Sequence, residues 1–266
     1  MKPRSTQHGL LGKVKRYVIG ADLHFPKMDQ GSFDAMLQVI KDISPEGFIF
    51  QGDQFDNEEI SHHTKGKPFY RERASFKRNT DNFDKHILQP LEGVLGKKAE
   101  KVWIIGNHDD WEFQLVEEQP ELEGMLDRPK LLQLQKRGWE LIPLGHSKRL
   151  GELNVIHGEV LTGVGNQAGM YPSRKAVELY AGNVLAAHTH APQSFAKISP
   201  VEHRKKHMGY INAILGSVNP TYLRNRPTAW LNGFSIVELY DKGFFNLYTV
   251  VVCDGKCAYG GKVYGK

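Results

Sequence analysis

Five short apolar segments of this chain each end at polar residues that can bind a metal or transfer a proton. The central one, 102–105, leads through Gly106 into Asn107, His108 and Asp109. The other four have the same design: 17–20 precedes Asp22 and His24, 48–50 precedes Asp53 and Asp56, 154–156 precedes His157, and 184–187 precedes His188 and His190. Short apolar runs bounded by turn residues are typical of buried strands. We therefore predict five buried strands whose ends form the walls of one site.

The segments around these strands predict an α/β organisation. Residues 15–20 and 47–50 are predicted strands, and Ser32 can cap a helix between them whose apolar residues share one face: Phe33, Met36, Leu37, Ile40 and Ile43. Such β-α-β units favour parallel strands. Further strands are predicted at 141–144, 153–156, 209–215, 233–240 and 244–252, the last two as a hairpin. Apart from a loose arm at 1–13, we expect one domain over 1–266.

Two polar stretches, 57–98 and 110–138, are predicted to be helical insertions that cap this domain. In the first, apolar residues recur at spacings of seven and four and predict one buried stripe: Phe69, Phe76, Phe83 and Ile87. The basic residues between them either form a solvated face, which we favour, or meet the phosphates of a long substrate: Lys67, Arg71, Arg73, Lys77 and Arg78. His62 and His63 are expected to be surface residues.

Composition places the chain among globular proteins. Its 266 residues are 40% hydrophobic and 10% aromatic, which allows a sizeable core. No apolar run approaches the roughly 20 residues of a membrane span, and the basic start of the chain lacks the apolar region of a secretory signal. We expect a soluble cytoplasmic protein without a membrane partner, in the host cytoplasm if a phage encodes it. The net charge of +5 permits a nucleic-acid partner but does not require one.

The polar groups at the predicted strand ends suit two metal ions. They are Asp22, His24, Asp53, Asn107, His157, His188 and His190. Carboxylate, imidazole and amide oxygen together suit Mn²⁺, Fe or Zn²⁺ better than Ca²⁺. Seven ligands are too many for one ion but suffice for two if one carboxylate bridges them. On an extended chain, side chains at i and i+2 point to the same side, which would explain the D-x-H and H-x-H spacings.

Two ions about 3.5–4 Å apart form a clamp for in-line displacement at phosphorus, in which a bridging hydroxide attacks. We expect Asp56 to orient His108, fix its tautomer and favour its protonated form, so that His108 assists the leaving group. Arg174, in a helix predicted to begin at Ser173, and Arg226, in the arginine-rich loop 222–230, are candidates for binding the substrate's anion. The alternative is that these arginines face solvent. The glycine-rich segment 158–172 is a candidate mobile loop.

In their order along the chain, these motifs resemble those of the calcineurin-like metallophosphoesterases. The matching stretches are D-x-H at 22–24, G-D-x-x-D at 52–56, G-N-H-D at 106–109, an isolated His157, and H-x-H at 188–190. The resemblance implies a four-layer α/β/β/α sandwich with two mixed sheets and a binuclear centre. It places Asp22, His24, Asp53 and His190 on one metal, and Asn107, His157 and His188 on the other, with Asp53 bridging. It makes His108 and Asp56 the catalytic pair.

Some residues depart from the family pattern, and these departures indicate which branches of the family the chain resembles less. Ala187 replaces the usual glycine before the last motif, and Asn57 stands where the protein Ser/Thr phosphatases carry arginine. The Mre11-type nucleases usually have histidine where Asp56 stands. The segment 222–230 and the hairpin after it are similar to phage and prophage metallophosphoesterases, which are often labelled DNA-repair exonucleases.

Three functions follow as hypotheses, in order of preference. The first is a metal-dependent phosphodiesterase or nuclease on DNA, RNA or a nucleotide. The second is a phosphomonoesterase on a small metabolite or phosphoprotein, and the third is a non-catalytic scaffold. We expect two divalent ions, with Mn²⁺ preferred over Fe, Zn, Mg, Ni or Co. The sequence leaves the oligomeric state open.

Overall fold

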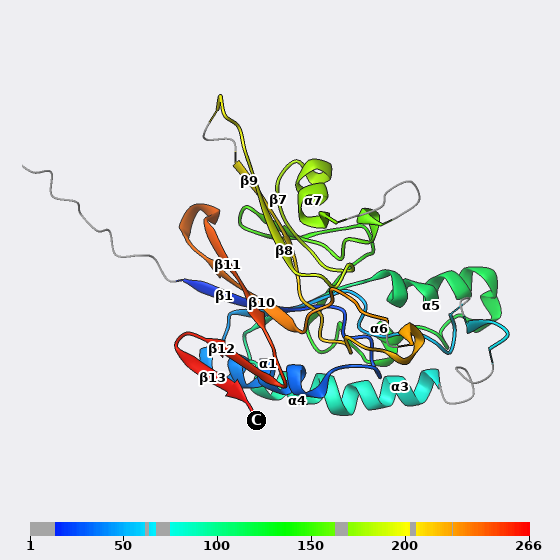
Figure 1. Cartoon of the computed structure of the whole chain (residues 1–266). Coiled ribbons are helices and arrows are strands. Elements are labelled where there is room, and N and C mark those ends of the chain that lie inside the picture. The colour runs from blue at the N-terminus through cyan, green and yellow to red at the C-terminus, as the bar shows by residue number, and fades with distance from the viewer. Residues whose placement is uncertain (1–13, 62–63, 68–74, 163–169, 203–205, 225) are drawn as a thin grey trace, which may run out of the picture.

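Two mixed β-sheets form the centre of the structure (Figure 1). The computed structural model describes residues 14–266 without 62–63, 68–74, 163–169, 203–205 and 225. The first sheet has the strand order β11-β10-β1-β2-β3-β4, and the second has the order β5-β6-β7-β9-β8. The strands of the first sheet are β1 (Lys15–Gly20), β2 (Gly47–Gln51), β3 (Glu100–Ile104), β4 (Trp139–Ile142), β10 (Gly233–Leu239) and β11 (Phe245–Val251). Those of the second are β5 (Lys148–Leu150), β6 (Leu153–Val155), β7 (Asn183–Ala186), β8 (Gln193–Ile198) and β9 (Lys206–Ile211).

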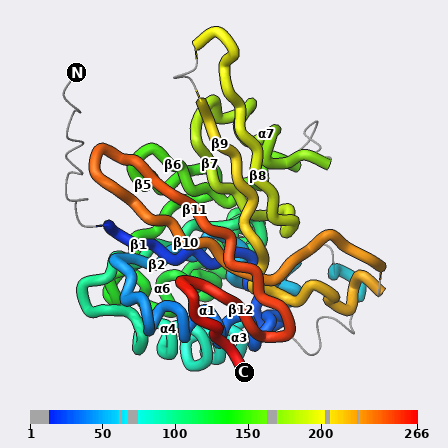
Figure 2. The backbone as a smooth tube through the Cα atoms, turned by 60° about the vertical axis from the view of Figure 1, so that its left-hand side comes forward, coloured from blue at the N-terminus to red at the C-terminus, as the bar shows by residue number. Residues whose placement is uncertain are grey.

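Helices cover the outer face of each sheet. They are α1 (Gln30–Ile43), α3 (Phe76–Phe83), a π-helical turn (Asp84–Leu88), α4 (Gln89–Val94), α5 (Asn107–Glu118), α6 (Arg128–Leu131) and α7 (Pro172–Tyr180). In Figure 1, α1, α3 and α4 lie outside the first sheet, whereas α7 lies against the second. A hairpin of β12 (Lys256–Tyr259) and β13 (Lys262–Gly265) packs on α1. Figure 2 shows β8 and β9 projecting beyond the rest of the second sheet. Within the described chain, no helix is long and apolar enough to cross a membrane.

Three apolar cores separate the layers. Successive residues of a strand face opposite sides of its sheet, so Phe48 and Phe50 pack with α1 in one core while Ile49 points into a second core between the sheets. In the second sheet, Leu185 enters the core between the sheets, and Val184 faces a third core beneath α7. The order of layers is therefore helix, sheet, sheet, helix, and the predicted α/β/β/α sandwich with two mixed sheets is confirmed.

The ends of several predicted elements differ from those in the structure. The first helix begins at Gln30 and is capped by Asp29, whose Oδ1 accepts a hydrogen bond from the Ser32 backbone at 2.7 Å, so Ser32 is not the cap. The strand predicted at 209–215 spans Lys206–Ile211. The short strands β5, β8, β12 and β13 were not predicted, since edge strands and hairpins with alternating exposure give only a weak apolar signal.

Helices form part of each polar insertion: 76–94 in the first, and residues 110–118 of α5 with Arg128–Leu131 in the second. Phe83 and Ile87 are buried and Phe76 is half-buried, whereas Phe69 lies outside the described residues, as do Arg71, Arg73, His62, His63 and residues 163–169 of the glycine-rich segment. Lys77 is exposed and pairs with Asp81 at 2.6 Å, which is typical of a solvated face. That the insertions cap a single domain stays a prediction.

Two buried amides join the sheets at the ends of their strands. Gln51, at the end of β2, donates hydrogen bonds from Nε2 to the carbonyls of Ile156 and Leu185 at 2.8 and 2.9 Å. Asn212 donates to Gln51 Oε1 at 2.8 Å and to the carbonyl of Ile19 at 3.2 Å. Because unpaired amides would be costly in this apolar interior, these bonds hold the carboxyl ends of β1, β2, β6 and β7 in one arrangement.

Candidate metal centre and adjoining pocket

The predicted ligand residues lie in loops after the carboxyl ends of five parallel strands. Five of them have positive φ angles: Asp22 at 50°, His24 at 48°, Asp53 at 53°, His188 at 63° and His190 at 60°. Non-glycine residues rarely adopt this left-handed conformation, and it persists where the surroundings over-determine it, often at functional sites. The prediction that the D-x-H and H-x-H pairs lie on extended chain is therefore wrong, because tight loops, rather than strand pleating, bring these side chains together.

One group of ligand atoms comes from Asp22, His24 and His190, whose donor atoms lie within 4.8 Å of one another. His190 Nε2 lies 3.5 Å from Asp22 Oδ1 and 3.3 Å from His24 Nε2. Asp22 is fully buried, and its Oδ1 makes no hydrogen bond within the described chain. Trp230 packs edge-on against the His190 ring, with 4.4 Å between centroids.

A second group comes from Asp53, His157 and His188, again within 4.8 Å. His157 Nδ1 lies 3.1 Å from the Gln51 carbonyl, which can only accept a hydrogen bond, so Nδ1 carries the proton. Its Nε2 faces Asn107 Oδ1 at 2.9 Å and Asp53 Oδ2 at 3.4 Å. His188 Nε2 lies 2.5 Å from Thr162 Oγ1, and its buried Nδ1 has no hydrogen-bond partner among the described residues.

Asp53 lies between the two groups. Its Oδ2 is 4.0 Å from His24 Nε2 in the first group and 3.4 Å from His157 Nε2 in the second. Its Oδ1 accepts a hydrogen bond from the His108 backbone at 2.9 Å. Asp53 therefore belongs to the second group and also approaches the first, and it forms a further group of ligand atoms with His24 and His108.

The electrostatics of the seven residues fit divalent cations. Burial lowers the pKa of His157, but the charge of Asp53 outweighs it and raises that pKa to about 10. Burial also raises the pKa of Asp53, yet the neighbouring histidines hold it well below its usual value. Burial lowers the pKa of His188 to about 4, which keeps that ring neutral and able to coordinate. Buried carboxylates that face imidazole nitrogens and an amide oxygen favour positive charge among them, and this donor set is consistent with two divalent metal ions.

The structure changes the expected relation between His108 and Asp56. His108 Nδ1 lies 3.1 Å from the backbone carbonyl of Asp56 and 3.9 Å from its carboxylate. The carboxylate instead lies 3.3 Å from His24 Nδ1 and 2.7 Å from Lys27 Nζ. The Asp56 carbonyl places the proton on His108 Nδ1 and leaves Nε2 free. Burial lowers the pKa of His108, although the charge of Asp53 and the charge and backbone carbonyl of Asp56 raise it, so Asp56 favours the protonated form but burial outweighs its effect.

Asp109 has a structural role that the sequence reasoning missed. Its buried carboxylate accepts hydrogen bonds from the backbones of Gly106, Phe55 and Gln54 at 3.0, 3.1 and 3.3 Å. These bonds fasten the loop after β3 to the loop after β2. The tight approach also explains Gly106, because a Cβ there would collide with Asp53.

A buried arginine in the second insertion also supports the site and was not predicted. Arg128 contacts Asn57 through Nη1, and Asn57 Nδ2 donates to the His108 carbonyl at 2.7 Å. Its guanidinium lies between the rings of Phe55 and Phe76, 4.0 and 3.8 Å from their centroids. A charged residue in an otherwise polar helical segment gives no local signal that it will be buried.

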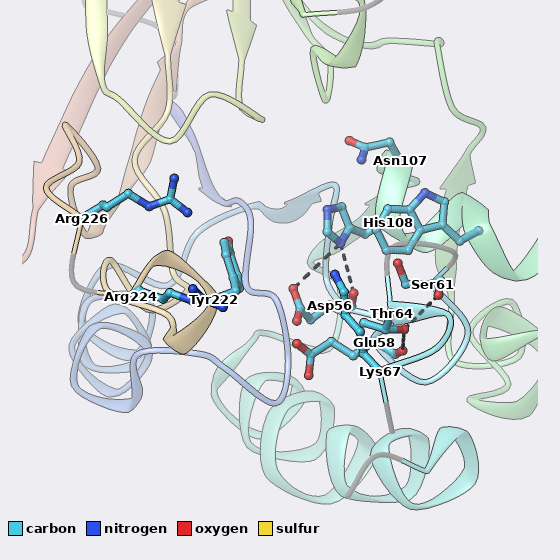
Figure 3. A pocket seen from close by; sticks show the side chains of 11 residues that line it. Asp56, Glu58, Ser61, Thr64, Lys67, Asn107, His108, Tyr222, Arg224 and Arg226 are labelled. Carbon is cyan, nitrogen blue, oxygen red and sulfur yellow. Dashed lines mark hydrogen bonds and ion pairs between the residues drawn. The ribbon is translucent and has the colours of Figure 1, made fainter. Parts of the chain in front are cut away.

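A pocket of about 530 Å³ adjoins the metal-ligand groups on the His108 side. Figure 3 shows His108 and residues of 58–67 on one side of it, and Tyr222, Arg224 and Arg226 on the other. Arg226 thus lines the pocket, in a position from which it could contact a substrate. Arg174 is not among the pocket residues, because it lies on α7, where it pairs with Glu178 at 3.0 Å.

Comparison with known proteins agrees with this geometry. The sequence model of the calcineurin-like phosphoesterase family matches residues 15–210. No curated protein matches the chain. Among solved structures, Vps29 from Cryptosporidium parvum is 12% identical with a TM-score of 0.48, covering 95% of this chain and 99% of that one. Vps29 complexed with zinc from Entamoeba histolytica is 11% identical with a TM-score of 0.44, covering 91% and 96%. The phosphoesterase Yfce from E. coli is 11% identical with a TM-score of 0.37, covering 88% and 98%. We draw no functional conclusion from these structural similarities.

Proposed function

The chain belongs to the family of calcineurin-like phosphoesterases and is a metal-dependent hydrolase, and from this premise we propose that it cleaves phosphodiesters, with nucleotides or nucleic acid as the substrate class. The observation that carries the hydrolytic function is the pair of adjoining His/Asp groups, one of which contains Asp53 while the other approaches Asp53 through His24. Phosphomonoester hydrolysis is the alternative that the same centre allows. The scaffold hypothesis is disfavoured because all seven ligand residues are present and grouped.

In this proposal the two groups hold two divalent ions. Asp22, His24 and His190 would hold one, and Asn107, His157 and His188 would hold the other, with Asp53 placed within reach of both. Bound ions of this kind polarise phosphoryl oxygens and lower the pKa of a coordinated water. Imidazole and carboxylate ligands accept several first-row metals, and we favour Mn²⁺ among them.

A side chain of the protein then supplies the proton that the leaving group needs. In hydrolysis, water oxygen bonds to phosphorus, one ester P–O bond breaks, and the departing oxygen takes up a proton. His108 is the proposed donor. Its Nδ1 is hydrogen-bonded to the Asp56 carbonyl, so Nε2 is the ring nitrogen that remains for the leaving oxygen. A bound phosphate brings negative charge close to the ring, which raises the pKa that burial lowers.

The placement of the cations favours diesters. A phosphomonoester brings up to two negative charges near neutral pH, and such a site gains from an additional cation beside the phosphorus. Lys27, which borders the ligand groups, is already paired with Asp56 and Glu58. Asn57 occupies the position of the arginine in the protein phosphatases. The arginines of the 221–226 loop line the pocket instead.

The finer identity of the protein is also part of this proposal. The similarity of the segment 222–230 to phage and prophage enzymes motivates a phage-type nuclease, and the lack of a spanning helix in the described chain is compatible with the cytoplasm. DNA and RNA are the partners we would test first.

Hydrolysis of two chromogenic substrates tests the proposal. Purified protein with Mn²⁺ is assayed with bis(p-nitrophenyl) phosphate and with p-nitrophenyl phosphate, and the Asp53→Asn protein serves as the blank. We expect kcat/KM for the diester to exceed that for the monoester by about tenfold or more, a difference of roughly 1.4 kcal/mol. Faster monoester turnover would overturn the diester assignment in favour of the monoesterase, and no turnover of either would overturn the enzymatic proposal.

A further inference from the structure

The pocket beside His108 has a charge pattern that the hydrolytic chemistry does not use. Its lining includes two acidic residues, Asp56 and Glu58, and three basic ones, Lys67, Arg224 and Arg226. Both acidic residues pair with Lys27, Asp56 at 2.7 Å and Glu58 at a short ion-pair contact. Lys27 offsets one of these two negative charges, and the three basic residues of the lining outweigh the other, so the net charge around the pocket is positive.

The two pocket arginines lack the carboxylate partner that four other described arginines have. Arg16, Arg128, Arg137 and Arg174 each form an ion pair with a glutamate. Within the described chain, no acidic side chain pairs with Arg224 or Arg226. Arg226 Nε donates a hydrogen bond to the Leu223 carbonyl at 3.1 Å. This bond fixes the side chain, and the Nη1 and Nη2 groups of the guanidinium remain available to a ligand.

Local hydrogen bonds and a short 3-10 turn shape the loop that carries these arginines. A 3-10 turn, Thr221–Leu223, ends at Arg224, which has a left-handed φ of 50°. The Leu223 carbonyl also accepts from the Arg226 backbone at 3.0 Å. Figure 3 shows the arginines on the side of the pocket opposite His108, with Tyr222 between them and the site. A ligand that reaches from the metal groups into the pocket therefore approaches these guanidinium groups.

Aromatic rings form the walls between the two ends of the pocket. Trp111 is partly buried and lies against His108, with ring centroids 4.1 Å apart and 31° between the planes. Tyr222 is 41% exposed and lies beside Lys27, 5.1 Å from Nζ to the ring centroid. Flat aromatic faces next to unpaired cations are suited to a ligand with a planar ring and an anionic group.

We propose that Arg224 and Arg226 form a subsite for a second phosphate, carried by the leaving group of the phosphodiester. The inference rests on the proposed function, because the scissile phosphate must lie at the metal groups and the leaving oxygen on the His108 side. Guanidinium groups bind phosphate oxygens with strong, charge-assisted hydrogen bonds. The substrate class is a short oligonucleotide in which the nucleoside released next to His108 bears its own phosphate.

Dinucleotides with and without an added phosphate test the subsite. We would compare the unphosphorylated thymidine dinucleotide TpT with its 5′-phosphorylated and 3′-phosphorylated forms, in Mn²⁺ and with wild-type protein. Only one phosphorylated form places its added phosphate on the leaving nucleoside. That form should have a kcat/KM about tenfold above that of TpT, which is the gain expected from one good charge-assisted hydrogen bond. In Arg224→Gln and Arg226→Gln proteins that ratio should fall toward one. The matched control is Arg149→Gln, which removes an exposed arginine of β5 and should keep the wild-type ratio.

Equal turnover of all three dinucleotides would refute the subsite and leave the hydrolytic function standing. If no dinucleotide is cleaved, the proposed function fails for this substrate class. A binding measurement then tests separately whether the phosphate subsite exists. Calorimetry with thymidine 3′,5′-bisphosphate and with thymidine needs no turnover. Tighter binding of the bisphosphate, lost in Arg224→Gln and Arg226→Gln, would support the subsite, and equal binding by wild type and variants would overturn it.

Discussion

Replacing Arg128 by methionine tests how far a buried charge holds the second insertion against the site. Arg128 is 2% exposed, and its guanidinium contacts Glu59 at 2.6 Å, Glu112 at 3.2 Å and Thr80 at 3.2 Å. Methionine retains the apolar length of the side chain and can contact the flanking Phe rings through sulfur. The change therefore removes the charge and its hydrogen bonds while it leaves only a small cavity.

The magnitude follows from which carboxylate remains charged. Removing one partner of a buried ion pair typically costs about 3–5 kcal/mol, because the other charge is left uncompensated. Burial raises the pKa of Glu112 to about 8 even with the charge of Arg128 lowering it, so Glu112 takes up a proton at neutral pH. Glu59 is then the main uncompensated charge. We expect the free energy of unfolding to fall by about 3 kcal/mol, the lower end of that range.

Urea denaturation followed by circular dichroism measures this loss at two pH values. The pKa of Glu112 in the folded protein lies above its usual 4.5, so its favourable contribution is present at low pH and is lost as pH rises through about 8. Without Arg128 the pKa rises further, and the variant's penalty should be larger at pH 9 than at pH 6.5. Arg149→Met, at an exposed position, should stay within about 0.5 kcal/mol of wild type. A penalty below about 1 kcal/mol for Arg128→Met would contradict the reasoning from buried charge, and a penalty that does not grow with pH would contradict the role of Glu112.

Three further changes address the metal groups and the proton donor. Mn²⁺ at 100 times its Kd should stabilise the wild type by about 2.7 kcal/mol per site; Asp53→Asn should lose most of the resulting Tm shift, whereas exposed Asp81→Asn should keep it. His108→Ala should retain the metal-induced shift yet hydrolyse the diester about 10²–10⁴-fold more slowly, and an unchanged rate would remove His108 from the mechanism. Gly106→Ala should abolish the metal-induced shift because its Cβ would collide with Asp53, while Gly93→Ala, which meets nothing within 4 Å, should be silent in the same assay.

The sequence by itself identified the residues that the structure brings together. The runs before Asp22, Asp53, Asn107, His157 and His188 are apolar and end in polar residues, and both properties are local. Strand formation depends on the same local pattern, so the five strands and their order followed from it. The α/β organisation could be predicted for the same reason, because alternating strands and amphipathic helices allow few layer arrangements, whereas the four-layer sandwich was implied by the resemblance to the calcineurin-like metallophosphoesterases. The roles of the ligand residues remain predictions.

Only the tertiary structure decided how each side chain is used. The motif pattern predicts Asp56 as the partner of His108, yet in the structure its carboxylate pairs with Lys27 and His24. Arg174 and Arg226 were equal candidates in sequence, and the fold placed one beside Glu178 and the other in the pocket.

The buried contacts that support the site were likewise invisible in the sequence. Arg128 reaches Asn57 across 71 positions of the chain, and Asp109 binds the backbone of Phe55 across 54. Local patterns report which residues face a core, because burial follows the period of a helix or strand. Which polar group meets which depends on how separate elements pack, and hydrogen bonds and ion pairs in a low-dielectric interior form only once that packing brings the partners within reach.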